Sequence, residues 1–374
     1  MGSVRRRADS DGRPGAWLAR WREPDGTQRK RSFTRKQDAI DHLTTVEGAK
    51  LAGTYTRPVK APTWDEWWTV FRESRGALRP STLARYDGLN RTYLSPEFGA
   101  WPIDRIGHDK VAAWVGRLSA QPRPAASTIR QAHRVLSLGL GFAVRSGKLR
   151  SNPADGITVK ASPARPTHAL DGPQLAALAD AAGSHGLEIR VLGLTGIRFG
   201  ELAALRVGDV DPRRRRITVR ASTTEVAGRL TTGPTKTHAI RTVAYPASLA
   251  PALAGQCLGK APGDWLFTAP GGGQLRIGNW RRRVFDPAVA AAGLPRVTPH
   301  DLRHTAASLA IRGGATIKDV QRQLGHATAT MTLDRYGHHF EDHLDDVADR
   351  LDALVPQGRP MAAGGGGAVR RLRA

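Results

Sequence analysis

Two proline-containing breaks divide this 374-residue chain into three stretches whose residue patterns differ. The first break covers Thr56–Pro62, and the second covers residues 154–168, which contain Pro163 and Pro166. Proline lacks a backbone donor and fixes φ, so neither break can continue a helix or a central strand. The chain is therefore expected to fold as several domains joined by linkers.

Residues 1–56 have the pattern of a small sheet followed by one helix. Residues 16–22 alternate as a strand does, residues 23–26 form a strong turn signal, and residues 27–33 suit the returning strand. A helix then follows with Thr34 as its cap, and its apolar face consists of Ile40, Leu43 and Val46. Basic residues outnumber acidic ones here, which favours DNA contact over a merely solvated sheet face.

Residues 63–153 are predicted to be helical. The first helix carries aromatic side chains at i, i+3, i+4 and i+7, a spacing typical of a core-facing stripe: Trp64, Trp67, Trp68 and Phe71. Later helices begin near Pro80, His108 and Ser127, and Asn152-Pro153 marks the end of the stretch. We expect the aromatic groups to pack inside this domain rather than to stack on bases.

Residues 168–355 mix helices with a strand pair at 216–220 and 240–243. Residues 356–374 contain a glycine run and a basic end, and they are predicted to be disordered. The expected fold class is therefore multidomain, with a small β-sheet plus helix (1–56), an all-α domain (60–155) and a mixed α+β domain (168–355).

The charge of the chain favours a polyanion as its partner. The chain has 57 Lys and Arg against 33 Asp and Glu, which gives a formal net charge of +24, and its pI is about 11.3. Each Lys or Arg that neutralises a phosphate releases counterions, so this surplus favours nucleic acid. Basic ribosomal-type and membrane-surface proteins reach similar values, so charge by itself leaves those classes open.

The single cysteine, Cys257, excludes an internal disulfide framework and a cysteine-based zinc cluster. The sequence contains no apolar run of about 18 residues, and no apolar run follows the basic N-terminus. Neither a transmembrane helix nor a signal peptide is predicted. We expect a cytoplasmic protein that acts where DNA is accessible, without a membrane partner.

Two segments of the third stretch each present one cation in a distinctive local setting. In Thr195–Leu202, a tight glycine turn places Arg198 at the start of a helix. In residues 234–238, a turn-like segment that carries Lys236 leads into a strand. Either cation, taken alone, is common in proteins without a functional role: an arginine at a helix start and a solvated lysine in a turn.

A well-formed helix start is predicted at Thr298, with Pro299 at the first helical position and Asp301 at the third. His300 and Arg303 lie at i and i+3, so they project from one helix face. A His and an Arg at a helix N-terminus form a natural phosphate site. Arginine has no lone pair to offer a metal, and no zinc site is predicted here.

The last segment contains a histidine at a helix end and a tyrosine. A helix with a capping box at Thr316 stops at Gly325, which places His326 directly after it. Tyr336 follows a few turns later. The chain has only five tyrosines, and packing is the default role of each.

Together and in order, these residues resemble the tyrosine recombinase family, the phage-type integrases and their bacterial relatives. The family's Arg…Lys…His-x-x-Arg…His…Tyr set is complete, as Arg198, Lys236, His300, Arg303, His326 and Tyr336. The flanking words Thr-Gly-Ile-Arg-Phe-Gly-Glu-Leu, Leu-Arg-His-Thr and Leu-Gly-His match as well. The resemblance implies an arm-type DNA-binding domain at 1–56, a SAM-like core-binding domain at 60–155 and a catalytic domain at 168–355.

The resemblance also implies a chemistry. Tyr336 attacks a DNA phosphodiester and stays attached as a 3′-phosphotyrosine ester, whose retained bond energy makes ATP unnecessary for resealing. Arg198 and Arg303 grip the non-bridging phosphate oxygens. Lys236 is the general acid toward the departing 5′-oxygen.

The two histidines have supporting roles in that chemistry. His300 assists with the tyrosine proton, and His326 donates to a phosphoryl oxygen. Glu201 orients neighbouring groups, and Asp301 caps its helix. Cationic side chains can do what Mg²⁺ does elsewhere, so no metal or other cofactor is expected.

The family's larger cycle implies a homotetramer that brings together two attachment-type sites in double-stranded DNA. A host DNA-bending protein and an excision factor are expected as further partners. An apolar stripe on a predicted C-terminal helix packs either on its own domain or on a neighbouring protomer: Leu344, Val347, Leu351 and Leu354.

Two other classes of protein compete with this interpretation. A type IB topoisomerase has nearly the same active site and relaxes DNA without a second site, but the N-terminal unit favours a recombinase. A DNA-binding regulator with a decayed site would normally lack one of the six residues. Within the recombinases, residues 1–56 favour integration of a mobile element over resolution of chromosome dimers.

Overall fold

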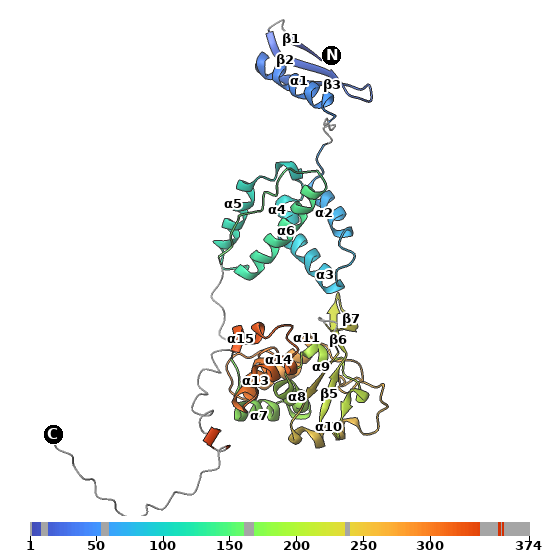
Figure 1. Ribbon diagram of the computed structural model, residues 1–374, viewed down its shortest axis with the longest axis vertical. Helices are drawn as coiled ribbons and strands as arrows, with labels where there is room; N and C mark the ends of the chain where they lie inside the picture. Colours follow the sequence, from blue (N-terminus) through green and yellow to red (C-terminus); the bar gives the residue numbers. More distant parts are fainter. Residues whose placement is uncertain are drawn as a thin grey trace, which may run out of the picture. The chain divides into compact units, whose positions relative to one another are not determined.

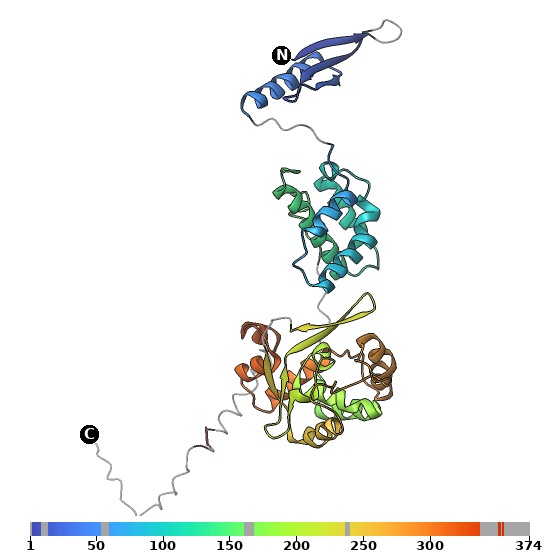
Figure 2. The ribbon, with the colours of Figure 1, turned by 90° about the vertical axis from the view of Figure 1, so that its right-hand side faces the viewer.

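The computed structural model describes residues 2–8, 14–53, 60–160, 168–235, 240–336, 351, 352 and 354. The chain divides into two compact units, Met1–Ala77 with Tyr86–Lys160 and Leu78–Arg85 with Ala161–Ala374 (Figures 1 and 2). The first unit has two separate hydrophobic cores, one for each N-terminal stretch. The domain limits expected from the sequence stay predictions, and the tail at 356–374 lies outside the described residues.

A three-stranded antiparallel sheet opens the first unit, with α1 packed against it (Figure 1). The strands are β1 (Ser3–Ala8), β2 (Pro14–Arg22) and β3 (Gln28–Phe33), and β2 is central. The two predicted strands and the helix, α1 (Lys36–Leu51), are confirmed. The sequence pattern does not predict β1, because its consecutive arginines, Arg5 to Arg7, give no alternation.

The helix α1 differs from the prediction at its start and in its buried face. Arg35, not Thr34, is the N-cap, and its side chain makes no capping hydrogen bond. Ala39 is buried with the two predicted residues Leu43 and Val46, whereas Ile40 is 37% exposed. Ala39, Leu43 and Val46 lie at i, i+4 and i+7, so the helix turns this stripe to the sheet and Ile40 away from it.

The rest of the first unit is helical. Its elements are α2 (Trp64–Glu73), α3 (Pro80–Leu89, which the two units share), η1 (Asn90–Leu94), α4 (Ser95–Phe98), η2 (Ile103–Arg105), α5 (His108–Ser119) and α6 (Ala126–Arg145). The predicted aromatic stripe on α2 is buried, which confirms its packing role. The Trp64 indole donates to Asn90 Oδ1 at 2.8 Å, and the Trp67 indole donates to the Gly139 carbonyl at 2.9 Å.

The linker predicted at 154–168 begins later than expected. Ala154 is buried in the helical core, and Ile157 and Val159 pack partly against it. These apolar side chains extend the domain beyond the Asn152-Pro153 stop signal. Residues 161–167 lie outside the described residues.

The second unit contains two small antiparallel sheets. In the first, β5 (Arg216–Val219) lies between β4 (Val210–Asp211) and β8 (Arg241–Ala244), which confirms the predicted strand pair. In the second, β6 (Ala221–Val226) and β7 (Arg229–Pro234) form a hairpin that extends from the unit (Figure 2). The sequence pattern does not predict this hairpin, because its threonine-rich strands show little apolar alternation.

Helices flank these sheets. They are α7 (Gly172–Ala181), η3 (Gly183–His185), α8 (Gly186–Thr195), α9 (Phe199–Leu202), η4 (Val207–Asp209), η5 (Ala247–Leu249), α10 (Ala250–Cys257), α11 (Ile277–Trp280), η6 (Arg281–Phe285), α12 (Asp286–Ala291), α13 (Asp301–Arg312), α14 (Ile317–Leu324) and α15 (Thr330–Tyr336). The helices α8 and α13 pack against each other, and α14 contacts α13, α15 and β8. Among the described residues, no helix has the length and apolar character needed to cross a membrane.

Candidate active site

The turn that carries Arg198 is formed at the end of α8. Gly196 ends that helix in the left-handed conformation, with φ of 70°, which favours glycine. A Cβ at this position would also overlap the Leu324 side chain and crowd Ala306. Arg198 then precedes α9 with 36% of its side chain exposed, so part of its guanidinium faces solvent.

Glu201 is the buried anchor of two arginines. Its carboxylate accepts the Arg198 backbone N–H at 2.8 Å and Arg198 Nη1 at 2.9 Å. Arg241, on β8, donates through Nη1 at 3.0 Å and through Nη2 at 2.6 Å. Burial by itself would raise the pKa of Glu201, but Arg241 and Arg198 together lower that pKa below its ordinary value. Glu201 therefore carries its charge and holds both guanidinium groups in place.

Arg303 lies inside the unit and is only 4% exposed. Its Nη1 donates to the Gly196 carbonyl at 2.7 Å, and its Nη2 donates to the Leu324 carbonyl at 2.6 Å. Burial and then the charge of Arg198 lower the pKa of Arg303 to about 9, although Glu201 and Tyr336 act in the opposite direction. The environment thus disfavours the positive charge, and a bound phosphate would relieve that penalty.

Tyr336, at the end of α15, is 4% exposed. Its ring belongs to a small apolar cluster with Ala307, Ile311, Val320 and Leu324. Its hydroxyl oxygen lies 2.7 Å from Nδ1 of His304, which is itself 3% exposed. Because His304 directly follows Arg303, one turn of α13 carries both the buried cation and the partner of the tyrosine hydroxyl.

His300 is exposed at the start of α13. Its ring stands edge-on to the His304 ring, with their centroids 5.1 Å apart. The backbone N–H and hydroxyl of Thr298 both donate to Asp301 Oδ2 at 2.8 Å, but the N-cap is His300 rather than the predicted Thr298. The helix itself begins at Asp301 rather than at Pro299, although His300 already has helical φ and ψ.

His326 follows the end of α14, as predicted. Thr316 forms the predicted capping box with Asp319, and Gly325 ends the helix with φ of 69°. The His326 Nδ1 is hydrogen-bonded to Thr332 Oγ1 at 2.9 Å. A pocket of about 580 Å³ lies beside it, and its lining includes the basic residues Arg241, Lys318 and Arg322.

Five of the six predicted catalytic residues fall in the described part of the chain, whereas Lys236 lies outside it. Arg303 is bonded to the carbonyl of Gly196, two residues before Arg198, and it directly precedes His304, whose Nδ1 lies 2.7 Å from the Tyr336 hydroxyl oxygen. The carbonyl of Leu324, two residues before His326, is bonded to Arg303. His300 contacts the same cluster through the edge-on packing of its ring against the His304 ring.

Two residues of this cluster are not in the predicted set. Arg241 lies on a strand that the sequence predicts, but nothing local indicates that it binds Glu201. His304 stands in the word Leu-Arg-His-Thr and lies four residues after His300. That helical spacing is the one sequence signal that could have placed both rings on the same face.

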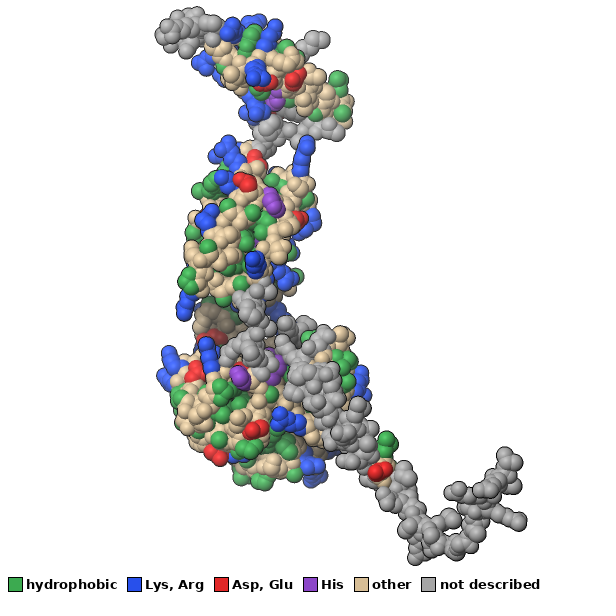
Figure 3. Space-filling model, turned by 90° about the vertical axis from the view of Figure 1, so that its left-hand side faces the viewer, with side chains coloured by type: hydrophobic (Ala, Val, Ile, Leu, Met, Phe, Trp, Pro, Cys, Tyr) green, Lys and Arg blue, Asp and Glu red, His purple; other side chains and the backbone are tan. Residues whose placement is uncertain are grey.

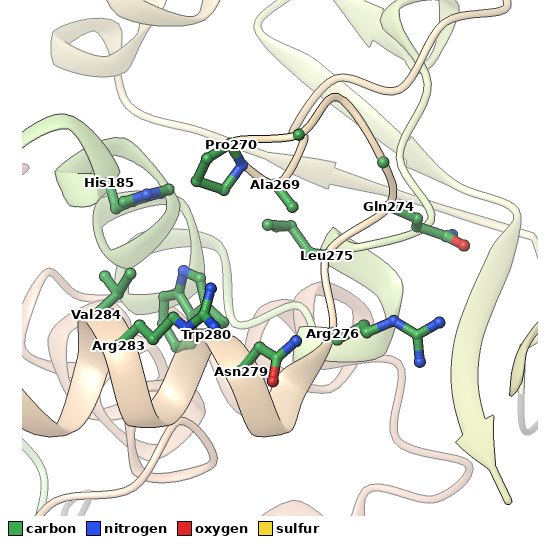
Figure 4. Close-up of a pocket in the computed structure, with 12 residues that line it drawn as sticks. His185, Ala269, Pro270, Gln274, Leu275, Arg276, Asn279, Trp280, Arg283 and Val284 are labelled. Atoms are coloured by element: carbon green, nitrogen blue, oxygen red, sulfur yellow. The ribbon is translucent and has the colours of Figure 1, made fainter. Parts of the chain in front are cut away.

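Two further surface features lie outside this cluster, a basic face and a second pocket (Figures 3 and 4). Lys and Arg side chains are spread over the visible face, with fewer acidic side chains among them (Figure 3). A separate pocket of about 510 Å³ contains none of the six predicted residues (Figure 4). Its lining combines apolar groups such as Leu275, Trp280 and Val284 with Arg276 and Arg283.

Comparison with known proteins agrees with this description. The model of the phage integrase family matches residues 171–343. An integrase of Mycobacterium phage FRAT1 is 28% identical over 297 residues, which cover 77% of this chain and 86% of that relative. Tyrosine recombinase XerC of Mycobacterium sp. (strain KMS) is 30% identical over 261 residues, which cover 67% of this chain and 82% of that relative.

Solved structures share the fold. The Tn1549 transposon integrase in complex with a circular intermediate DNA has a TM-score of 0.67 at 21% identity, covering 78% of this chain and 99% of that one. A lambda integrase tetramer bound to a Holliday junction has a TM-score of 0.58 at 18% identity, covering 85% and 92%. The chain therefore belongs to the phage integrase family of tyrosine recombinases, the enzymes of site-specific DNA recombination.

Proposed function

We propose that this recombinase cleaves and rejoins double-stranded DNA through a 3′-phosphotyrosine link to Tyr336, and that it integrates and excises a phage or another mobile element. The observation that carries the proposal is the cluster on α13, where Arg303 directly precedes the residue that binds the Tyr336 hydroxyl. The residue that we propose as the nucleophile, on α15, is thus bonded to the helix that carries a cation suited to a phosphate, α13.

The two arginines suit the transition state of this reaction. Attack on the phosphodiester concentrates negative charge on its non-bridging oxygens, and fixed donors stabilise that charge by about 3–4 kcal/mol each in comparable sites. Arg198 is anchored by Glu201 and partly exposed, so it can meet the phosphate from the surface. Arg303 would meet the same group from within the fold.

Proton transfers complete the proposed chemistry. Lys236 protonates the departing 5′-oxygen, since that role needs a proton on a mobile arm. His300 assists with the tyrosine proton, and His326 donates to a phosphoryl oxygen. In this scheme neither a metal ion nor ATP is required, because cations of the chain stabilise the phosphate and the phosphotyrosine ester retains the bond energy.

We further propose that the chain works as a homotetramer on two attachment-type sites in the cytoplasm, assisted by a host DNA-bending protein and an excision factor. The lambda integrase tetramer on a Holliday junction supports the tetramer by analogy. The sheet at β1–β3 supports a mobile-element integrase with an arm-type DNA-binding domain over a dimer resolvase. The predicted C-terminal helix at 344–354 is described only in part, so its docking on a neighbouring protomer stays a prediction.

Covalent trapping tests the proposal. The purified chain is incubated in EDTA, without ATP, with nicked duplexes made from the DNA that flanks its gene. We expect a denaturant-stable protein–DNA adduct from the parent chain and none from Tyr336→Phe, which lacks the nucleophilic oxygen. The variant must still bind the duplex.

Other results of the same assay would overturn parts of the proposal. An adduct that persists in Tyr336→Phe would place the nucleophile elsewhere. Adducts formed equally on any supercoiled DNA, with relaxation and no site preference, would indicate a topoisomerase. A requirement for added Mg²⁺ would refute the metal-free scheme.

A further inference from the structure

The contact between His304 and Tyr336 involves two buried side chains. The 2.7 Å distance joins the Tyr336 hydroxyl oxygen to His304 Nδ1, and the two residues are 3% and 4% exposed, respectively. A buried hydrogen bond has no water to compete with it, so it holds its two side chains more strongly than the same bond at the surface. The hydroxyl proposed as the nucleophile is therefore held by an imidazole nitrogen.

The helix that carries His304 is itself firmly held. Arg303 is bonded to the carbonyls of Gly196 and Leu324 on two other elements. Thr305 accepts the Leu170 backbone N–H at 2.9 Å. The residues on both sides of His304 are thus tied to distant segments, so the imidazole occupies a defined position.

Apolar side chains surround the ring of Tyr336. The residue ends the short helix α15, and its ring contacts an apolar cluster on α13 and α14. Apolar packing sets the approximate place of the ring, and with it the hydroxyl oxygen, but it has little directional preference and tolerates small shifts. The hydrogen bond to His304 supplies a directional contact at that oxygen.

We propose that His304 is a positioning residue for the nucleophile, and that its Nδ1 sets the place of the Tyr336 hydroxyl relative to the phosphate held by Arg303. This inference rests on the proposed function of Tyr336. Misplacing a reacting atom by about 1 Å can cost on the order of 100-fold in rate. Loss of the Nδ1 hydrogen bond should therefore slow cleavage while leaving DNA affinity unchanged.

The test uses amides of two lengths on the full chain. In His304→Asn, the side-chain amide reaches about as far as Nδ1 and can keep the hydrogen bond. In His304→Gln, the same amide lies one methylene further out and misses that position. His304→Phe keeps an aromatic ring without any polar atom.

The readouts are the single-turnover cleavage rate on a nicked duplex, the Kd for that duplex and the 19F resonance of 3-fluorotyrosine at position 336. We expect Gln and Phe to slow cleavage by about 10- to 100-fold, with Kd within about twofold of the parent. The Asn variant should retain most of the rate. The resonance, assigned by its loss in Tyr336→Phe, should shift in Gln and Phe but not in Asn.

Several results would overturn the inference. Equal rates in all three variants and the parent would show that the hydrogen bond does not matter, and equal losses in Asn and Gln would show that Nδ1 is not the relevant atom. Faster cleavage by Gln and Phe would show that His304 restrains Tyr336 instead of positioning it. Cleavage by Tyr336→Phe would refute the proposed function itself, which separates the two failures.

Discussion

At the scale of single residues, Glu201 carries a negative charge almost out of contact with water. Its side chain is 1% exposed, and it accepts hydrogen bonds from Arg198 and Arg241. Burying a carboxylate is costly unless its partners replace the lost water. Without that charge, Arg241, whose side chain is 13% exposed, would lack its counter-ion.

We predict that Glu201→Gln lowers the free energy of unfolding by about 3 kcal/mol at pH 7. It should also slow DNA cleavage, because Arg198 loses its anchor. The pKa of Glu201 lies below its ordinary value of 4.5, so the stabilisation is complete above that value and is lost as pH falls through the folded-state pKa. Urea unfolding across pH should show the gap between parent and variant narrowing in acid.

Glu188 provides a matched control, because the fold raises its pKa whereas it lowers the pKa of Glu201. It is buried and lies 2.9 Å from His185 Nδ1, and burial raises the pKa of Glu188. In this case the folded chain favours the protonated form, so the parent should lose stability relative to Glu188→Gln as pH rises above 4.5. A gap for Glu201→Gln that stays constant from neutral pH into acid would contradict the assignment of its charge.

At the scale of secondary-structure elements, Gly196 is where α8, α13 and α14 meet. It ends α8, its carbonyl accepts from Arg303, and its Cα hydrogens face Leu324 and Ala306. The chain therefore requires both a positive φ and the absence of a side chain at this position.

We predict that Gly196→Ala destabilises the chain by more than the strain of its backbone. Gly183 has a similar φ of 58°, and a methyl group there would meet open space, so Gly183→Ala measures the strain alone, about 1–2 kcal/mol. Overpacking at Gly196 should add about 1–3 kcal/mol and slow cleavage by moving Arg303. Equal losses of stability in the two variants would show that Leu324, on α14, moves aside for the added methyl group without a measurable cost.

At the scale of the whole molecule, the net charge of +24 predicts DNA affinity that falls steeply with salt. Part of that charge lies on β3, where Lys30 and Arg31 are located. Arg31 lies over the Phe33 ring at 5.3 Å, so its side chain is supported by the sheet. Lys30 and Arg31 point to opposite faces of β3, which lies at the edge of the sheet, so both can reach a DNA backbone that runs along this edge.

We predict that Lys30→Gln with Arg31→Gln makes the DNA-binding constant less dependent on salt. The negative slope of its logarithm against the logarithm of salt concentration should become shallower by about 0.9 for each phosphate that the strand no longer neutralises. Binding to a duplex that contains the arm-type site should weaken without loss of the fold. The control is Lys148→Gln with Arg150→Gln, in the expected core-binding domain, measured on a duplex that contains the arm-type site alone, where its slope should match that of the parent. An unchanged slope for the β3 variant would argue against DNA binding by this sheet.

Much of the fold could be predicted because it depends on neighbours in the sequence. The aromatic stripe on α2, the capping box at Thr316 and the glycine stop at Gly325 all involve interactions within a few residues, and all are observed. The departures have local causes too. Ile40 is turned outward because Ala39 faces the sheet in its place, and β1 lacks the alternation that identifies a strand.

The sequence by itself determined the identity and order of the candidate catalytic residues, along with the helix ends that present Arg198 and His326. The helix next to His300 begins at Asp301, two residues later than the sequence predicts. Only the tertiary structure decided which side chains meet. Glu201 and Arg241 are 40 residues apart, and His304 and Tyr336 are 32 apart. No local pattern encodes these pairings, because they arise where packed helices and strands bring distant segments together.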